Sequence, residues 1–126
     1  MERSARRHLL GGPVNRPSLR PHDVAVVHVP FVERQGARKR PVVVLSSADA
    51  NAATGVAIVA MITRDDAPAW HGDLPVTRHQ DAGLHKPCKI RMKLYTIETQ
   101  ELSPIGQLHE EDQGRLTDGM KRLLSL

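Results

Sequence analysis

The sequence predicts a mainly β protein, built as one small domain, with a single α-helix at the end. Three observations lead to this prediction: several short apolar or alternating segments, turn residues between them, and one stretch of helical periodicity late in the chain. The connections are too short for several βαβ crossovers. We therefore expect a small barrel of antiparallel strands rather than a parallel sheet.

Six segments have the composition of strands. In chain order they are residues 23–31, 40–47, 56–63, 74–78, 88–98 and 104–108. The second contains the uninterrupted apolar run Val42-Val43-Val44-Leu45, which predicts a buried strand. The fifth alternates apolar residues with lysine and arginine, which predicts a strand with one exposed face. Residues 48–55 are expected to form the turn between the second and third strands.

The last element is expected to be a helix over residues 110–124. Leu116, Met120, Leu123 and Leu124 follow helical spacing along one face. Acidic residues fill its first turn and basic residues its last, as the helix dipole favours.

The charge of the chain divides it into two parts. The 126 residues carry a formal net charge of +4, and residues 1–22 hold five arginines against one glutamate, which accounts for all of it. These residues show no sustained periodicity, so we expect a flexible basic N-terminal extension, with a transit peptide as the alternative. Residues 23–126 are expected to form one domain.

Several classes of protein are disfavoured by composition. The single Cys88 cannot form an internal disulfide and is typical of a reducing cytosol, so a cytoplasmic location is expected. No apolar run reaches the roughly 18 residues of a membrane span. His85 and Cys88 lack partners at zinc-ligand spacing, so no metal site is expected.

Within the domain the charges separate. Residues 33–40 and 86–93 are basic and flank expected strands, whereas residues 98–118 hold most of the acidic side chains. Two basic clusters beside buried strands indicate a binding site for a polyanion.

One pair of residues stands out when the second and third strands are placed in register. If Ser47 pairs with Val56 across the turn, Arg40 falls opposite Thr63 on one face at the open end of the sheet. A guanidinium and a hydroxyl in that arrangement can bind one phosphate. The alternative is a surface arginine at a strand start and a threonine that merely ends a strand.

Three stretches resemble the MazF/PemK family of toxin endoribonucleases. They are the Asp-Val-Ala-Val-Val-His-Val-Pro-Phe strand followed by Arg-Pro-Val-Val-Val-Leu-Ser and Ala-Met-Ile-Thr within residues 23–63, the Gly-Leu-His-Lys-Pro-Cys block within residues 82–97, and Ile-Gly-Gln-Leu at residues 105–108. The resemblance extends over residues 21–124, nearly the whole domain.

The resemblance implies a Src-homology-3-like barrel with a C-terminal helix, acting as a homodimer. It further implies cleavage of single-stranded RNA without metal or cofactor, and inhibition by a cognate antitoxin. The family's Arg-Pro arginine falls on Arg40 and its strand-end threonine on Thr63.

The chain departs from the family pattern at three positions. His22 stands where a glycine is usual before the first strand, and Cys88 replaces the serine of the Lys-Pro-Ser block. Met92 occupies the position at which some members carry an acid in the fifth strand. The remaining acid near the expected site is Glu33, in the loop after the first strand.

Metal-free RNA cleavage uses the 2′-hydroxyl of the substrate as its nucleophile, and it needs a base, an acid and donors to the phosphate. Arg40 is expected to supply donors and Thr63 to orient a phosphate oxygen. Glu33 is expected to belong to the catalytic group, and it and His28 are the candidate bases. For His28 a packed or rim histidine is the alternative.

RNA contacts are expected mainly through the phosphate backbone, because aromatic residues make up only 2% of the chain. Surface charge without function is the alternative for each basic residue in this set. The expected RNA-binding residues are Arg34, Arg38, Lys39, Ser46, Arg64, Lys86, Arg91 and Lys93.

Two other functions remain open at this stage. A toxin homologue that only binds RNA or an antitoxin fits the presence of Met92. A CcdB-type gyrase poison uses the same barrel and acts through its final helix, but it has no need of Arg40 and Thr63.

Overall fold

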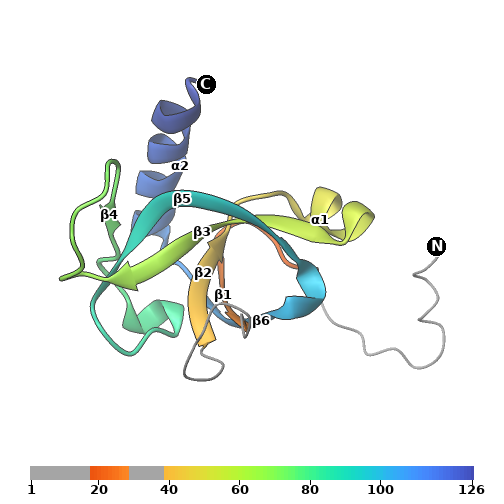
Figure 1. Ribbon diagram of the computed structural model, residues 1–126, viewed down its shortest axis with the longest axis horizontal. Helices are drawn as coiled ribbons and strands as arrows, with labels where there is room; N and C mark the ends of the chain where they lie inside the picture. Colours follow the sequence, from red (N-terminus) through yellow and green to blue (C-terminus); the bar gives the residue numbers. More distant parts are fainter. Residues whose placement is uncertain (1–17, 29–38) are drawn as a thin grey trace.

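The computed structural model describes residues 18–28 and 39–126. Its six strands form one antiparallel sheet in the order β4-β5-β3-β2-β1-β6. The strands are β1 (Asp23–His28), β2 (Lys39–Val44), β3 (Val56–Arg64), β4 (Leu74–Pro75), β5 (Cys88–Glu98) and β6 (Leu102–Gln107). Two α-helices, α1 (Ala48–Thr54) and α2 (Glu110–Leu124), lie at opposite ends of the curved sheet in Figure 1. The expected fold class is confirmed.

β5 and α2 have the bounds expected from the sequence, whereas the turn expected at residues 48–55 is wrong. The segment forms α1, with Ser47 as the N-cap that accepts from the Ala50 N–H (3.1 Å). Gly55 ends the helix with a φ of 77°, a conformation that glycine adopts without strain. A capped seven-residue helix therefore joins the same two strand ends that a turn would have joined.

The chain just before β1 packs against α1 and β2. The Leu19 side chain is buried, and its carbonyl accepts from the buried Asn51 amide of α1 (2.9 Å). The His22 N–H donates to the Val44 carbonyl (2.8 Å), and His22 has a φ of 77°. This left-handed conformation favours glycine, which gives a physical reason for the glycine usual at that point in the resembling family. Residues 18–22 thus pack with the sheet and α1, and residues 1–17 lie outside the described part.

Two apolar clusters cover the two faces of the sheet. One contains Val43, Ala60, Ile62 and Ile90, and it packs against Leu116 and Met120 of α2. The other is formed by Leu19, Ala25, Val27, Val42, Val44, Ala57, Val59 and Leu102. Burial of both faces explains why the first three strands read as continuous apolar runs. Leu123 and Leu124, expected on the packed face of the helix, are exposed.

Two glycines allow β6 to approach the turn before β5. A Cβ on Gly83 would lie 2.3 Å from the Ile105 carbonyl oxygen, and one on Gly106 would lie 2.4 Å from that of Ala82. Backbone therefore packs on backbone, and no larger residue fits at either position. Neither helix of the described chain is long and apolar enough to span a membrane.

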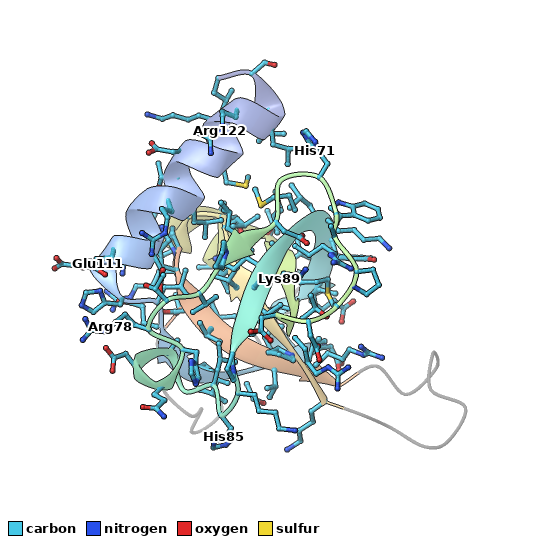
Figure 2. The ribbon with its side chains drawn as sticks, turned by 90° about the vertical axis from the view of Figure 1, so that its left-hand side faces the viewer. His71, Arg78, His85, Lys89, Glu111 and Arg122 are labelled. Atoms are coloured by element: carbon cyan, nitrogen blue, oxygen red, sulfur yellow. The ribbon has the colours of Figure 1, made fainter. Side chains whose placement is uncertain are left out.

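The buried carboxylate of Asp112 joins α2 to the chain that follows β4. It accepts from the Thr77 N–H (3.1 Å) and hydroxyl (2.9 Å), from the Arg78 N–H (3.2 Å) and from the Arg115 guanidinium. Figure 2 shows Arg78 close to the first turn of α2, where Glu111 lies. Burial by itself raises the pKa of Asp112, but these hydrogen bonds outweigh it and leave the pKa below its usual value.

We predict that Asp112→Asn lowers the free energy of unfolding by about 2 kcal/mol, because an amide cannot accept all of these bonds. A depressed carboxyl pKa stabilises the fold above the unfolded-state value of roughly 4, and this contribution is lost as the pH falls further. Urea unfolding followed by circular dichroism, at pH 7 and in steps below pH 4, measures both effects. Asp118→Asn, at an exposed position of the same helix, is the control; equal losses for the two variants would contradict the anchoring role.

Candidate functional site

The register between β2 and β3 agrees with the expected one over its described length. Val42 pairs with Met61, Val43 with Ala60 and Val44 with Val59. Arg40 and Thr63 each lie two residues beyond the Val42–Met61 pair, which is the last described pair of this ladder. Alternation along both strands places their side chains on the same face as Val42 and Met61.

Pro41 explains why the ladder ends there. The Leu45 N–H donates to the Ile58 carbonyl (2.8 Å). Because strand backbone groups alternate in direction, the N–H and C=O groups of Leu45, Val43 and residue 41 all face β3. Pro41 is in that set, and it has no N–H to donate across to Ile62. Arg40 continues to pair with Val27 of β1, and β2 therefore stays in the sheet while its ladder with β3 ends.

On its other side, β3 remains paired with β5 up to Arg64. Thr63 lies opposite Lys89, and Met61 lies opposite Arg91. Directly opposed residues share a face, so Lys89 and Arg91 lie on the same face as Thr63 and Arg40. Figure 2 shows Lys89 on β5, between the loop that carries His71 and the turn that carries His85.

A bulge in β5 determines where Met92 and Lys93 lie. Ala60 pairs with Leu94 but Met61 with Arg91, so the two intervening residues have no partner in β3. Met92 is buried in the cluster under α2, and Lys93 is exposed. Met92 therefore lies on the face opposite to Thr63, away from the expected site.

Asp73 forms the centre of a polar cluster with Lys89, Arg91 and Trp70, which we call the Asp73 cluster. Its carboxylate accepts from Arg91 Nε (3.3 Å), Arg91 Nη2 (3.1 Å) and the Trp70 N–H (3.0 Å), and it lies 3.2 Å from Lys89 Nζ. The side chains of Asp73, Lys89 and Arg91 are 13%, 12% and 18% exposed. One carboxylate facing two cations leaves the cluster with a net positive charge.

The two cations of the cluster also hold the backbone of the loop between β3 and β4, residues 65–73. Lys89 Nζ donates to the Ala67 carbonyl (2.7 Å), and the Arg91 guanidinium donates to the Pro68 carbonyl. Burial raises the pKa of Asp73, but the hydrogen bonds from Arg91, Lys89 and Trp70 outweigh it, so the pKa lies below its usual value. The carboxylate is thus ionised at neutral pH and holds the loop against β5.

The expected RNA-binding residues fall into three groups in the structure. Lys39, Lys86 and Lys93 are exposed, as is Arg64, which forms an ion pair with Asp66 (3.2 Å). Arg91 is mostly buried in the Asp73 cluster. The Ser46 hydroxyl lies 2.5 Å from Asn51 Oδ1 and accepts from the Ile58 N–H (2.8 Å), so it joins α1 to β3. Glu33, Arg34 and Arg38 lie outside the described residues.

Cys88 is no nucleophile in this structure. The thiol is buried, and burial together with the Asp65 and Asp112 carboxylates raises its pKa to about 11. It is therefore protonated at neutral pH. Within residues 18–28 and 39–126, no group of three or more His, Cys, Asp or Glu side chains is placed to hold a metal ion.

Sequence reasoning missed Asp73, Lys89 and Trp70. The only signal was the polar half of the β5 alternation, which marked an exposed face but did not indicate a carboxylate from another loop. Asp73 reaches the two cations of β5 across 16 and 18 positions in the chain, and no short motif connects them.

The family model for PemK-like, MazF-like toxins of type II toxin–antitoxin systems matches residues 21–124. The chain belongs to this family. The match covers all six strands and both α-helices, together with the turn that holds Gly83. No curated protein sequence is similar enough to count as a significant match.

Solved structures of MazF toxins share the fold. The MazE–MazF complex (Form-II) from Deinococcus radiodurans is similar with a TM-score of 0.65 at 14% identity, covering 85% of this chain and 95% of that one. Mycobacterium tuberculosis toxin MazF-mt6 has a TM-score of 0.65 at 20% identity, covering 82% and 97%. An endoribonuclease in complex with its cognate antitoxin from a mycobacterial species has a TM-score of 0.68 at 14% identity, covering 88% and 97%.

We predict that Asp73→Ala lowers the free energy of unfolding by about 2 kcal/mol, because it leaves Lys89 and Arg91 mostly buried without their counter-charge. Asp66→Ala breaks an exposed ion pair with Arg64 in the same loop and should cost less than about 0.5 kcal/mol. Urea unfolding of both variants followed by circular dichroism measures the difference. A similar small cost for both would show that the cluster does not hold the loop.

Proposed function

We propose that this toxin is an endoribonuclease that cleaves single-stranded RNA without a metal ion, by attack of the substrate's own 2′-hydroxyl. The observation that carries the proposal is the position of Arg40 and Thr63, on one face of the sheet at the point where the ladder between β2 and β3 ends. Both side chains belong to paired strands, since Arg40 pairs with Val27 and Thr63 with Lys89. Groups on rigid strands can hold a phosphate in a fixed geometry.

In the proposed reaction the 2′-oxygen bonds to phosphorus while the bond from phosphorus to the 5′-oxygen breaks. The products are a 2′,3′-cyclic phosphate and a free 5′-hydroxyl. Negative charge grows on the non-bridging oxygens, and the planar Arg40 guanidinium supplies fixed donors to them. Thr63 orients one of these oxygens, because an unperturbed hydroxyl is a poor acid.

One proton must leave the 2′-hydroxyl and another must reach the 5′-oxygen. Glu33 and His28 remain the proposed bases. Glu33 lies outside the described residues, and the backbone of His28 pairs with Lys39 at the end of β1, next to Arg40 in the chain.

The charge around the site supports an RNA substrate. Exposed Lys39, Lys86 and Lys93, together with the net positive Asp73 cluster, lie on or beside the strands that carry Arg40 and Thr63. Contacts from such cations to phosphates displace condensed counterions, so binding should weaken as salt rises. Arg64, next to Thr63, is proposed to contact RNA at the expense of its exposed pair with Asp66.

We further propose a cognate antitoxin and a homodimer as the partners of this chain. The similar structures include a MazE–MazF complex and an endoribonuclease in complex with its cognate antitoxin, which supports an antitoxin here. A symmetric dimer would extend the basic face across two copies.

We predict that Arg40→Lys keeps RNA binding but lowers the cleavage rate by about 100-fold, because lysine keeps the charge and loses the fork of donors. Thr63→Ala should lower the rate by about tenfold, and Thr63→Ser should recover part of that loss. Both residues act on one phosphate, so the double variant should lose less than the product of the two single losses. The readout is the initial cleavage rate in EDTA on an oligoribonucleotide chosen by mapping cuts in a long RNA.

Arg122→Lys, the same substitution near the far end of α2, is the control and should leave the rate unchanged (Figure 2). Circular dichroism confirms that each variant is folded. Full activity in folded Arg40→Lys would contradict the mechanism. RNA binding without cleavage by the wild type would favour the toxin homologue that only binds.

A further inference from the structure

Trp70 is the single tryptophan of the chain, and 44% of it is exposed. It lies in the 65–73 loop, next to the face that carries Thr63. A tryptophan that serves only to fill a core is buried, because its large apolar surface makes exposure costly. The exposed ring is therefore a candidate ligand-binding surface.

Two cations lie over the ring of Trp70. Lys93 Nζ is 5.0 Å from the ring centroid, and the Arg91 guanidinium carbon is 5.7 Å from it. The two side chains differ in mobility. Arg91 is held by its ion pair with Asp73, whereas the Lys93 side chain is exposed at the β5 bulge and can reorient its ammonium toward an incoming anion. The ring is thus a flat apolar surface with one fixed and one adaptable positive charge beside it.

The Asp73 cluster holds the backbone of Trp70 next to the proposed cleavage site. Asp73 accepts from the Trp70 N–H, and Lys89, which lies opposite Thr63, binds both Asp73 and the loop carbonyl of Ala67. Thr63 is therefore connected to the backbone of Trp70 through its strand partner Lys89 and through Asp73. A loop held in this way loses little conformational entropy when a ligand binds beside it.

We propose that Trp70 and Lys93 form a nucleotide subsite, in which one base of the RNA stacks on the indole ring and the adjoining phosphate binds the Lys93 ammonium. This inference rests on the proposed function, and it assigns one base of the substrate to a specific surface. The chemistry matches on both counts, since every nucleobase presents a flat π-face and every nucleotide carries a phosphate. An acidic peptide would satisfy the cations but would leave the ring uncovered.

The first test uses the fluorescence of Trp70, which reports on this site without any substitution because the chain has no other tryptophan. Titration with a fully 2′-O-methylated, non-cleavable oligoribonucleotide should quench the emission, while fluorescence anisotropy of the labelled oligonucleotide measures binding in parallel. Inorganic polyphosphate and polyglutamate, which carry charge but no bases, should bind with little quenching.

The outcomes separate this inference from the function on which it rests. Binding in the anisotropy measurement with unchanged tryptophan emission would overturn the subsite and leave the proposed function intact. Quenching by polyphosphate or polyglutamate equal to that by the oligonucleotide would also overturn it. No binding of the oligonucleotide would count against both.

The second test compares substitutions. Trp70→Ala should weaken oligonucleotide binding about tenfold and raise KM by a similar factor with kcat little changed, because stacking away from the reacting phosphate contributes to binding alone. Trp70→Phe should restore most of the affinity, whereas Trp70→Leu, apolar but without a π-face, should restore little. Equal recovery by Phe and Leu would contradict stacking.

Tyr95→Ala is the matched control. Tyr95 also lies on β5 and is 41% exposed, close to the value for Trp70, but among the described residues no cation lies over its ring. It should leave both affinity and KM unchanged. A loss equal to that of Trp70→Ala would show that any exposed aromatic has the same effect, and it would overturn the assignment of this subsite.

Discussion

The candidate site lies where Pro41 interrupts the hydrogen bonding between β2 and β3. β3 is paired with β5 through Arg64, but its ladder with β2 ends at Met61, because Pro41 has no N–H to offer Ile62. The strand segment that carries Thr63 consequently has one described neighbour, on the β5 side. Arg40 stays in the sheet through its pairing with Val27 of β1.

Cations in this fold divide into those that hold the structure and those that face solvent. Lys89 and Arg91 form ion pairs with Asp73 and donate to two loop carbonyls, which fixes the 65–73 loop beside the site. The β5 bulge then brings Lys93 out of the strand ladder and over Trp70. Removal of Lys89 or Arg91 would therefore lower stability, whereas removal of Lys93 would leave the fold intact and, under the proposed function, weaken RNA binding.

Much of the fold could be predicted because its patterns are local. The pairing of Val42 with Met61 was expected from an assumed pairing of Ser47 with Val56 across a turn, and it is confirmed because the short helix α1 joins the same two strand ends. The helix itself had readable caps in Ser47 and Gly55. Asp73 could not be paired with Lys89 from sequence, because nothing local connects a loop carboxylate to a distant strand. Arg91 was expected to face RNA, since alternation reports which face a residue occupies and not whether another loop covers it.

The chemistry of the product ends is the most direct test of metal-free cleavage by the 2′-hydroxyl. Incubation of the wild-type protein with a long single-stranded RNA in EDTA, followed by analysis of both new ends, should give 2′,3′-cyclic phosphates and free 5′-hydroxyls. These ends follow from attack by the 2′-oxygen with Arg40 and Thr63 on the phosphate. Cleavage that leaves 5′-phosphates, or that occurs only when a divalent metal is added, would contradict it.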